Sequence, residues 1–281
     1  MLQLALPIVR TVAELRARVA AWRAQGDRIG LVPTMGALHE GHLSLVHLAK
    51  TRVRRVVASV FVNPTQFGPN EDFDAYPRDE AKDAQSLASA ECDLLYAPTV
   101  TEMYPIGFST SVTVSGVSAT MDGIARPGHF SGVATVVSKL LLQCAPDVAV
   151  FGEKDYQQLL VIRRLVRDLD IPVEIIGAPT ARLDDGLARS SRNAYLSEAE
   201  RIVAGRMNVI MTDAAVRLRA GEAQDVVEAE GLAALKIAGF DRIDYFEVRG
   251  AEDLARPAKA PMRIFAAAFA GKTRLIDNMA V

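Results

Sequence analysis

The chain has 281 residues, half of them hydrophobic, so it can bury a large core in one large domain or two smaller ones. Its formal net charge of -2 gives no electrostatic reason to expect a nucleic acid or an anionic membrane as a partner. No segment approaches the roughly 20 uninterrupted apolar residues that span a bilayer. Cys92 and Cys144 are isolated, without metal-ligand spacing, so we expect reduced core thiols in a soluble, cytoplasmic protein.

Helices and strands alternate along the first part of the sequence. A capping box of Thr11 and Glu14 opens a helix that ends near Gly26. The apolar run 56–62 is rich in β-branched residues and is typical of a strand buried on both faces of a parallel sheet. Further strands are predicted at 29–32, 93–96, 148–151 and 173–176, and further helices at 41–49, 79–90, 130–144 and 156–168. This alternation predicts an α/β fold with a Rossmann-like, doubly wound parallel sheet.

The character of the sequence changes after Pro179. A second capping box, Ser197 with Glu200, opens a helix that runs to about Gly221, and another helix is predicted at 225–238. The runs 243–248, 263–269 and 273–276 predict antiparallel strands. We therefore expect two domains, a Rossmann-like domain at 1–178 and a smaller C-terminal α+β domain at 179–281 that closes over the active site. The polar alternation at 110–115 predicts an extra edge strand or hairpin.

Three polar turns follow directly on predicted strands, at 35–42, 63–67 and 152–155. Because parallel strands end at the same edge of a sheet, the three turns should meet there. Open α/β sheets bind their ligands at that carboxyl edge. We therefore expect a ligand site formed by these turns.

Two imidazoles, His39 and His42, lie three residues apart in the first turn and would share one helical face. The start of a helix presents backbone N–H groups and a positive dipole end to an anion, and Gly36 and Gly41 allow a close approach. A His-x-x-His pair also suggests zinc, but no third His or Cys lies nearby. A nucleotide-phosphate site is the better interpretation, and packed or solvated histidines are the alternative.

The other candidate residues each have a functional and a plainer interpretation. Lys154 is either a phosphate ligand or a solvated charge, and the segment 189–193 is either a clamp over a triphosphate or a flexible basic turn. Gln66 and Gln158 offer neutral amides that suit the hydroxyl or carboxylate groups of a small substrate. Asp83 could bind a metal ion, although a lone Asp on a helix is usually solvated.

Six motifs, in their order and spacing, resemble the pantothenate synthetase family. They are Met35-Gly36-Ala37-Leu38-His39-Glu40-Gly41-His42, Phe61-Val62-Asn63-Pro64-Thr65-Gln66-Phe67, Tyr76-Pro77-Arg78, Arg126-Pro127-Gly128-His129-Phe130, Gly152-Glu153-Lys154-Asp155-Tyr156-Gln157-Gln158 and Ser190-Ser191-Arg192-Asn193. The resemblance extends to the motif 274–278. It implies ATP-dependent condensation of pantoate with β-alanine through a pantoyl adenylate, with Mg²⁺, in a homodimer of the nucleotidyltransferase-like Rossmann class.

The resemblance also implies roles for individual residues. It places the phosphates of ATP on His39 and His42, marks His42 as a proton donor, and gives Lys154 and Arg192 catalytic roles. Gln66 would bind both pantoate and β-alanine, and Gln158 would bind pantoate. The remaining ATP-binding residues would be Met35, Gly36, Ala37, Leu38, Glu40, Gly41, Gly152, Glu153, Asp155, Ala181, Arg189, Ser190 and Ser191. Arg189 stands where methionine or leucine is expected, and we expect its side chain to point to solvent.

Two other functions stay open at this point. A cytidylyl- or adenylyltransferase acting on a phosphorylated substrate would share the histidine turn, but Gln66 and Gln158 suit a neutral or carboxylate substrate better than a phosphate. A nucleotide sensor without turnover would bind ATP and leave it intact when pantoate, β-alanine and Mg²⁺ are added.

Overall fold

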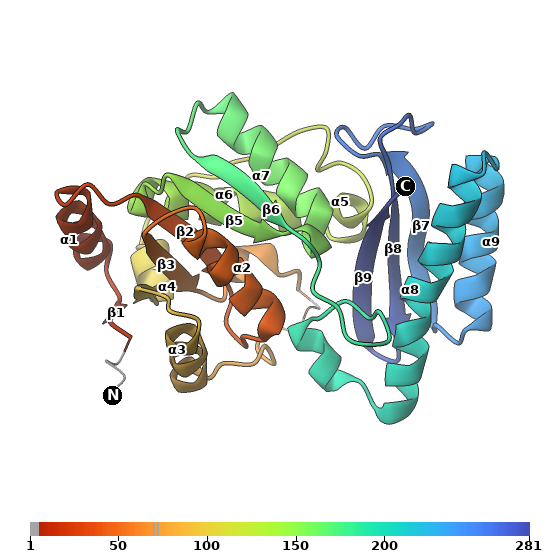
Figure 1. The fold of residues 1–281 in the computed structure, drawn as a ribbon, viewed down its shortest axis with the longest axis horizontal. Coiled ribbons are helices and arrows are strands. Elements are labelled where there is room, and N and C mark those ends of the chain that lie inside the picture. The colour runs from red at the N-terminus through yellow and green to blue at the C-terminus, as the bar shows by residue number, and fades with distance from the viewer. Residues whose placement is uncertain (1–5, 70, 72) are drawn as a thin grey trace.

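The computed structural model of the chain describes residues 6–69, 71 and 73–281, and in them it shows a six-stranded and a three-stranded sheet (Figure 1). The strands of the first sheet are β1 (Ile8–Val9), β2 (Ile29–Thr34), β3 (Arg55–Val60), β4 (Leu94–Tyr96), β5 (Val148–Gly152) and β6 (Glu174–Ala178). Those of the second are β7 (Arg242–Gly250), β8 (Met262–Ala270) and β9 (Thr273–Ala280). The α-helices are α1 (Val12–Arg23), α2 (Glu40–Lys50), α3 (Glu80–Ser89), α4 (Val100–Met103), α5 (Asp122–Ala125), α6 (His129–Cys144), α7 (Tyr156–Asp168), α8 (Glu198–Arg219) and α9 (Gln224–Ile237). Three short 3-10 helices are η1 (Pro64–Gln66), η2 (Glu153–Asp155) and η3 (Ser191–Tyr195).

Both faces of the first sheet are buried, as the apolar strand sequences predict. Val148 and Val150 of β5 pack into a core shared with α2 and α3. Ala149 and Phe151, which alternate with them, belong to a second core shared with α1, α6 and α7. Helices therefore cover the sheet on both sides, which is why its central strands are apolar on both faces (Figure 1).

The strand order of the first sheet is β1-β4-β3-β2-β5-β6, with every pair parallel. After β1, at one edge of the sheet, the chain forms β2 in the middle and adds β3 and then β4 on one side of it. It then returns to place β5, and after it β6, on the other side of β2. The direction of winding reverses between β2 and β5, which creates a crevice at their carboxyl ends. The doubly wound, Rossmann-like sheet that the sequence predicts is confirmed.

Local signals at the helix ends were also predicted correctly. Thr11 with Glu14 and Ser197 with Glu200 both form reciprocal capping boxes, at the starts of α1 and α8. Gly26 ends the turn after α1 with a φ of 79°, a left-handed conformation that glycine adopts without a Cβ clash.

The second sheet is antiparallel, as predicted, and its two faces contact different partners. Helices α8 and α9 cover one face, on the side away from the first sheet (Figure 1). The other face contributes Tyr245, Phe265 and Ala267 to the core that α6 and α7 share with the first sheet. This packing places the carboxyl edge of β5 and the start of α7 beside β8 and β9.

Some local predictions were wrong or incomplete. The segment 110–115 is not a strand: the Val112 N–H donates to Thr135 Oγ1 of α6 at 2.9 Å, and Val114 is buried. The short elements β1, α4 and α5 were not predicted. In the part of the chain that the structure describes, none of the helices has the length and apolar character needed to cross a membrane.

Candidate active site

A cavity of about 230 Å³ opens at the carboxyl ends of β2 and β5, where the winding of the sheet reverses. It brings together most of the predicted residues: Met35, His39, Gly41, His42, Gln66, Gly152, Lys154, Asp155, Gln158, Ala181, Arg189, Ser190, Ser191 and Arg192. The other predicted residues do not line this cavity; they are Gly36, Ala37, Leu38, Glu40, Asp83 and Glu153.

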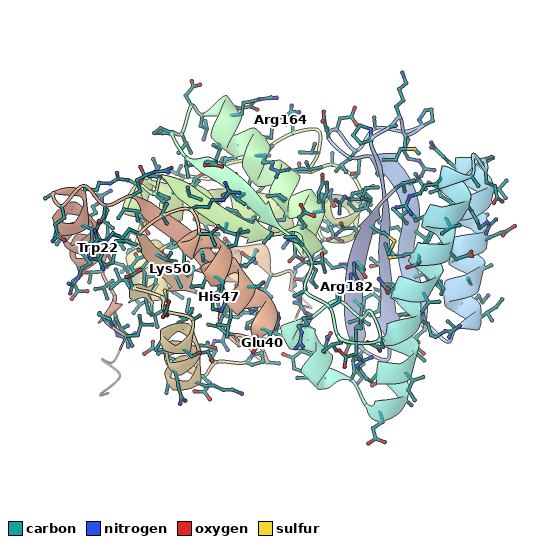
Figure 2. The ribbon with its side chains drawn as sticks, in the orientation of Figure 1. Trp22, Glu40, His47, Lys50, Arg164 and Arg182 are labelled. Atoms are coloured by element: carbon teal, nitrogen blue, oxygen red, sulfur yellow. The ribbon has the colours of Figure 1, made fainter. Side chains whose placement is uncertain are left out.

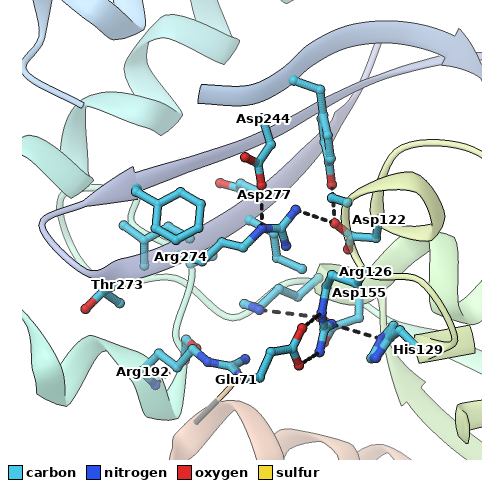
Figure 3. Close-up of a pocket in the computed structure, with 18 of the residues that line it drawn as sticks. Glu71, Asp122, Arg126, His129, Asp155, Arg192, Asp244, Thr273, Arg274 and Asp277 are labelled. Atoms are coloured by element: carbon cyan, nitrogen blue, oxygen red, sulfur yellow. Dashed lines mark hydrogen bonds and ion pairs between the residues drawn. The ribbon is translucent and has the colours of Figure 1, made fainter. Parts of the chain in front are cut away.

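A larger cavity of about 1320 Å³ continues from the first one into the space between the two sheets (Figure 3). Arg126, His129, Lys154, Gln158 and Arg192 line both cavities. The first cavity therefore opens toward the second sheet, through a zone that carries several cationic groups.

His39 and His42 begin helix α2 with a capping box made of two imidazoles. The Nδ1 atom of His39, the N-cap residue, accepts from the Gly41 N–H at 3.1 Å, and the His42 Nδ1 accepts from the His39 N–H at 3.3 Å. The two ring centres are 4.1 Å apart. Because each Nδ1 is an acceptor, the proton of each neutral ring must be on Nε2, which is left to donate to a ligand.

Both imidazoles are neutral at physiological pH. Burial, helped by the charges of Lys154 and Arg189, lowers the pKa of His39 to about 4. Burial and the neighbouring His39 and Lys154 lower the pKa of His42 to about 3. The pair can therefore donate two neutral Nε2–H hydrogen bonds to phosphate oxygens, while the positive charge at the site comes from lysine and arginine.

We expect nitrogen NMR of the histidines to show the Nε2–H tautomer of His39 and His42 unchanged from pH 8 to pH 5. The unfolded chain in urea, where histidines titrate near pH 6.5, serves as the control. Below about pH 6.5 these histidines bind protons in the unfolded chain but not in the folded chain. They should therefore lower the free energy of unfolding as the pH falls from about 6.5 toward about 4. An inflection near pH 6.5 for either folded histidine would contradict this.

Gln66 is oriented by its neighbours so that its amide N–H group faces the cavity. The Gln66 Oε1 accepts from Asn63 Nδ2 at 3.0 Å, and the Gln66 Nε2 lies 3.2 Å from the sulfur of Met35. Helix α6 packs tightly behind this turn: a Cβ on Gly132 would lie 2.3 Å from the Thr65 carbonyl oxygen. Gln66 thus presents a donor that suits a carboxylate or hydroxyl oxygen.

The two adjacent glutamines at the start of α7 have different roles. Gln157 is buried, and its Nε2 donates to the carbonyls of Val117 and Thr120 at 2.9 and 2.7 Å. Gln158 is half-buried and lines both cavities. Of the two, Gln158 is therefore the glutamine that lies where a substrate could reach it, and its binding of pantoate stays a prediction.

Asp83 holds the backbone of the first turn instead of facing the cavity. Its carboxylate accepts from the Ala37 N–H at 3.0 Å and the Leu38 N–H at 2.8 Å. Positive φ angles at Gly36 (87°) and Ala37 (51°) turn these amides toward Asp83. The two N–H groups are therefore not available to a phosphate. Asp83 is buried and lines neither cavity, so the structure adds no support for its contact with a metal ion, which stays a prediction. Among residues 6–69, 71 and 73–281, no group of three or more His, Cys, Asp or Glu side chains is arranged to hold a metal ion.

The Asp83→Asn variant should test this anchor. The amide keeps one acceptor but turns an NH₂ group toward a backbone N–H, so we expect a loss of about 1–3 kcal/mol in the free energy of unfolding. The affinity for ATP should fall while the Mg²⁺ concentration needed for half-maximal activity stays the same. A raised Mg²⁺ requirement with unchanged stability would restore the metal-ligand interpretation.

The segment 181–192 supplies cationic and hydroxyl groups beside the histidine turn, since a Cβ on Gly41 would lie 3.5 Å from the Ala181 Cβ. The Arg189 N–H donates to the Ala181 carbonyl at 2.9 Å, and Ser191 Oγ lies 3.3 Å from the hydroxyl of Tyr76. Arg189 lines the cavity, and its charge helps to lower the pKa of His39. The expectation that this side chain points to solvent was therefore wrong.

Arg126 and His129, which the sequence placed in a motif without a specific role, line the larger cavity. The Arg126 guanidinium binds the Glu71 carboxylate at 2.6 Å (Figure 3). His129 Nδ1 donates to the Gln66 carbonyl at 2.9 Å. Both Arg126 and His129 lie in a motif of the family resemblance, but the ion pair with Glu71 has no local signal in the sequence.

A second missed cluster joins the two sheets. Arg274 of β9 binds Asp122 at 2.6 Å and Asp244 at 2.8 Å, and the Tyr245 hydroxyl also donates to Asp122 (Figure 3). Burial acts to raise the pKa of Asp122, but the Arg274 guanidinium outweighs it and holds that pKa below its usual value. Asp122 therefore remains a carboxylate that ties α5 to the second sheet.

An open parallel sheet with a polar, cation-lined cavity at its switch point defines a nucleotide-binding α/β enzyme of the Rossmann-like class. The family model described as pantoate-beta-alanine ligase matches residues 7–280. The chain belongs to this family, and the resemblance found in the sequence is confirmed.

Its relatives match it over nearly their whole length. The pantothenate synthetase of Caulobacter vibrioides is 62% identical over 279 residues, which is 98% of each chain. The crystal structure of the pantothenate synthetase from Thermus thermophilus is 47% identical, with a TM-score of 0.92 over 98% of this chain and 99% of that one. The pantoate-beta-alanine ligase of Francisella tularensis, solved in complex with beta-gamma ATP and beta-alanine, is 36% identical with a TM-score of 0.84 over 98% of each chain.

Proposed function

We propose that this chain condenses pantoate with β-alanine at the expense of ATP, giving pantothenate, AMP and pyrophosphate through a pantoyl adenylate. The observation that carries this proposal is the convergence of Gln66, the neutral His39 and His42 pair and Lys154 on one cavity, in a member of the pantoate–β-alanine ligase family. The Francisella tularensis relative supports it, since that protein was crystallised with beta-gamma ATP and beta-alanine.

In the first step, a carboxylate oxygen of pantoate attacks the α-phosphorus of ATP, and the bond to the departing pyrophosphate breaks. The nucleophile is already ionised, so this step needs charge stabilisation more than a general base. We infer that His39 and His42 donate neutral Nε2–H hydrogen bonds to the phosphates, and that Lys154 and Arg192 neutralise the growing charge on pyrophosphate. Gln66 and Gln158 would hold pantoate in line with the α-phosphate.

In the second step, the free amine of β-alanine attacks the acyl carbon of the adenylate, and AMP leaves with the electron pair of the broken bond. The β-alanine ammonium must lose a proton first. His42, with a pKa of about 3, is a weak acceptor for that proton, so we assign it to water. Gln66 would also contact the incoming β-alanine.

Magnesium fits this site as part of the ATP complex. Mg²⁺ keeps several waters and usually binds substrate phosphates together with one or two carboxylates. Among the described residues, no group of three or more His, Cys, Asp or Glu side chains could hold a metal ion, and Asp83 is buried outside both cavities; both observations are compatible with delivery of Mg²⁺ on the triphosphate. Its chemistry would be to offset negative charge on the phosphates.

Isotope exchange tests the adenylate directly. With ATP, Mg²⁺ and pantoate alone, the enzyme should exchange labelled pyrophosphate into ATP, and omission of pantoate should abolish the exchange. A cytidylyltransferase would need CTP and a phosphorylated acceptor, and a nucleotide sensor would exchange nothing. Exchange that required β-alanine would remove the adenylate intermediate and favour a concerted route.

We also propose a cytoplasmic homodimer with two domains, 1–178 and 179–281, the second closing over the active site. The free, buried thiols of Cys92 and Cys144 suit a reducing compartment. Residues 109–111 are exposed and overlap the segment 110–115, for which the sequence predicted an edge strand or hairpin, so they are available to a partner chain. Light scattering on the eluted protein should give twice the chain mass of 30.3 kDa; a mass equal to one chain would contradict the dimer.

A further inference from the structure

Two consecutive residues of β9, Asp277 and Asn278, contact two different loops of the active site. Their side chains are 4% and 3% exposed, so both lie in the protein interior. They belong to the motif 274–278 that ends the family resemblance, and the reaction described above gives them no role. Because neighbouring residues of a strand point to opposite sides, one strand can contact two loops at once.

Asn278 binds the backbone of the loop that carries Lys154. Its Nδ2 atom donates to the carbonyl oxygens of Glu153 and Lys154, each at 2.8 Å. Its Oδ1 atom accepts from the guanidinium of Arg263. A carbonyl can only accept and a guanidinium can only donate, so the orientation of this amide group is fixed.

The loop that Asn278 contacts has little support of its own. It is the single turn η2, which has no side-chain cap at its start. Arg263 of β8 also contacts this turn from the second sheet. Its guanidinium pairs with the Glu153 carboxylate at 3.6 Å and lies 3.8 Å above the ring centre of Tyr156. Residues of β8 and β9 therefore contact both the backbone and a side chain of the turn that carries the Lys154 ammonium.

Asp277 holds the second cationic loop. Its carboxylate binds the Arg182 guanidinium at 2.6 and 2.9 Å. Arg182 lies where the chain passes from the first sheet toward the second (Figure 2), next to Ala181, whose carbonyl binds the Arg189 N–H. The charges of Lys154 and Arg189, one from each loop, both lower the pKa of His39, so the two loops face the same imidazole.

We propose that Asn278 is a positioning residue: through the carbonyls of Glu153 and Lys154 it fixes the Lys154 ammonium against the phosphates, while Asp277 fixes the facing loop. This inference rests on the proposed function. It makes the second sheet part of the catalytic apparatus, because the sheet sets the position of a catalytic cation.

A double-mutant cycle tests the inference. Asn278→Leu keeps a side chain of similar size, removes both donors and adds no charge. We expect kcat to fall by about tenfold or more, since small displacements of a catalytic group are costly. In a Lys154→Ala background the same substitution should cost less than about threefold, because the group it positions is already gone.

Gln224→Leu is the matched control. It also removes a carboxamide that donates to the backbone, since Gln224 Nε2 of α9 donates to the Ala258 carbonyl at 2.7 Å. Neither Gln224 nor Ala258 lines either of the two cavities. It should leave kcat unchanged even if the melting temperature falls. If Asn278→Leu fails to fold, Asn278→Ala is carried through the same cycle.

The outcomes separate this inference from the proposed function. The positioning role would be overturned if Asn278→Leu lowered kcat by the full tenfold in the Lys154→Ala background. It would also be overturned if Asn278→Leu left the kcat of the otherwise unchanged enzyme as it was. Absence of turnover in the parent chain would instead overturn the proposed function. In that case the NMR chemical shift of the Lys154 ammonium still tests the positioning role. Asn278→Leu should change this shift and Gln224→Leu should not. An unchanged shift in Asn278→Leu refutes the inference.

Discussion

The His42→Asn variant should fold normally and lose about 100-fold or more in kcat, the usual cost of removing a hydrogen-bond donor to a transition state. Asparagine can replace the Nδ1 acceptor that binds the His39 N–H, so the capping box at the start of α2 is kept. It cannot reach as far as Nε2. Steady-state kinetics together with thermal unfolding therefore separate the catalytic role of this imidazole from its structural role.

The matched control for this variant is His47→Asn, because His47 lies exposed in the last turn of the same helix (Figure 2). His42→Gln, whose amide extends toward the Nε2 position, should recover part of the lost activity. Near-normal turnover in a folded His42→Asn enzyme would show that the imidazole only caps the helix.

Lys154→Ala should lower kcat by about 100-fold or more and weaken ATP binding by less than about tenfold. The reason is that the ammonium follows charge that develops on pyrophosphate, and an interaction made mainly in the transition state affects the rate more than the affinity. Lys154 is 20% exposed and lies 3.5 Å from Asp155, so its charge acts in a partly dry cavity. Single-turnover kinetics give the rate, and calorimetry gives the affinity.

Lys236→Ala, on an exposed position of α9, controls for the loss of a lysine elsewhere and should leave both quantities unchanged. Equal losses of ATP affinity and turnover in Lys154→Ala would mean that the ammonium binds ground state and transition state alike.

The parts of the fold that depend on local sequence were predictable. Capping boxes, the glycine after α1 and the apolar strands next to β2 all act within a few residues, and the alternation of elements was enough to predict the doubly wound sheet. The segment 110–115 shows the limit of this reasoning. Its residues have strand propensity, but pairing needs a neighbouring strand, and Val112 finds a side chain of α6 instead.

The residue types of the site were also predictable, but their states were not. The sequence placed His39 and His42 at the start of a helix, yet their low pKa values come from burial and from cations in distant segments. The surroundings of Asp83 and Arg189 were not predicted for the same reason. The partners of Asp83 lie about 45 residues away, and the cavity that Arg189 lines is closed by other loops.

The contacts that hold the two cationic loops join residues far apart along the chain: Asn278 is 125 residues from Glu153, and Asp277 is 95 residues from Arg182. Closing such long loops costs chain entropy, which the native contacts at both ends of each loop must offset. The first sheet alone therefore does not complete the nucleotide site: the last strand, β9, must dock before both cationic loops have their native partners.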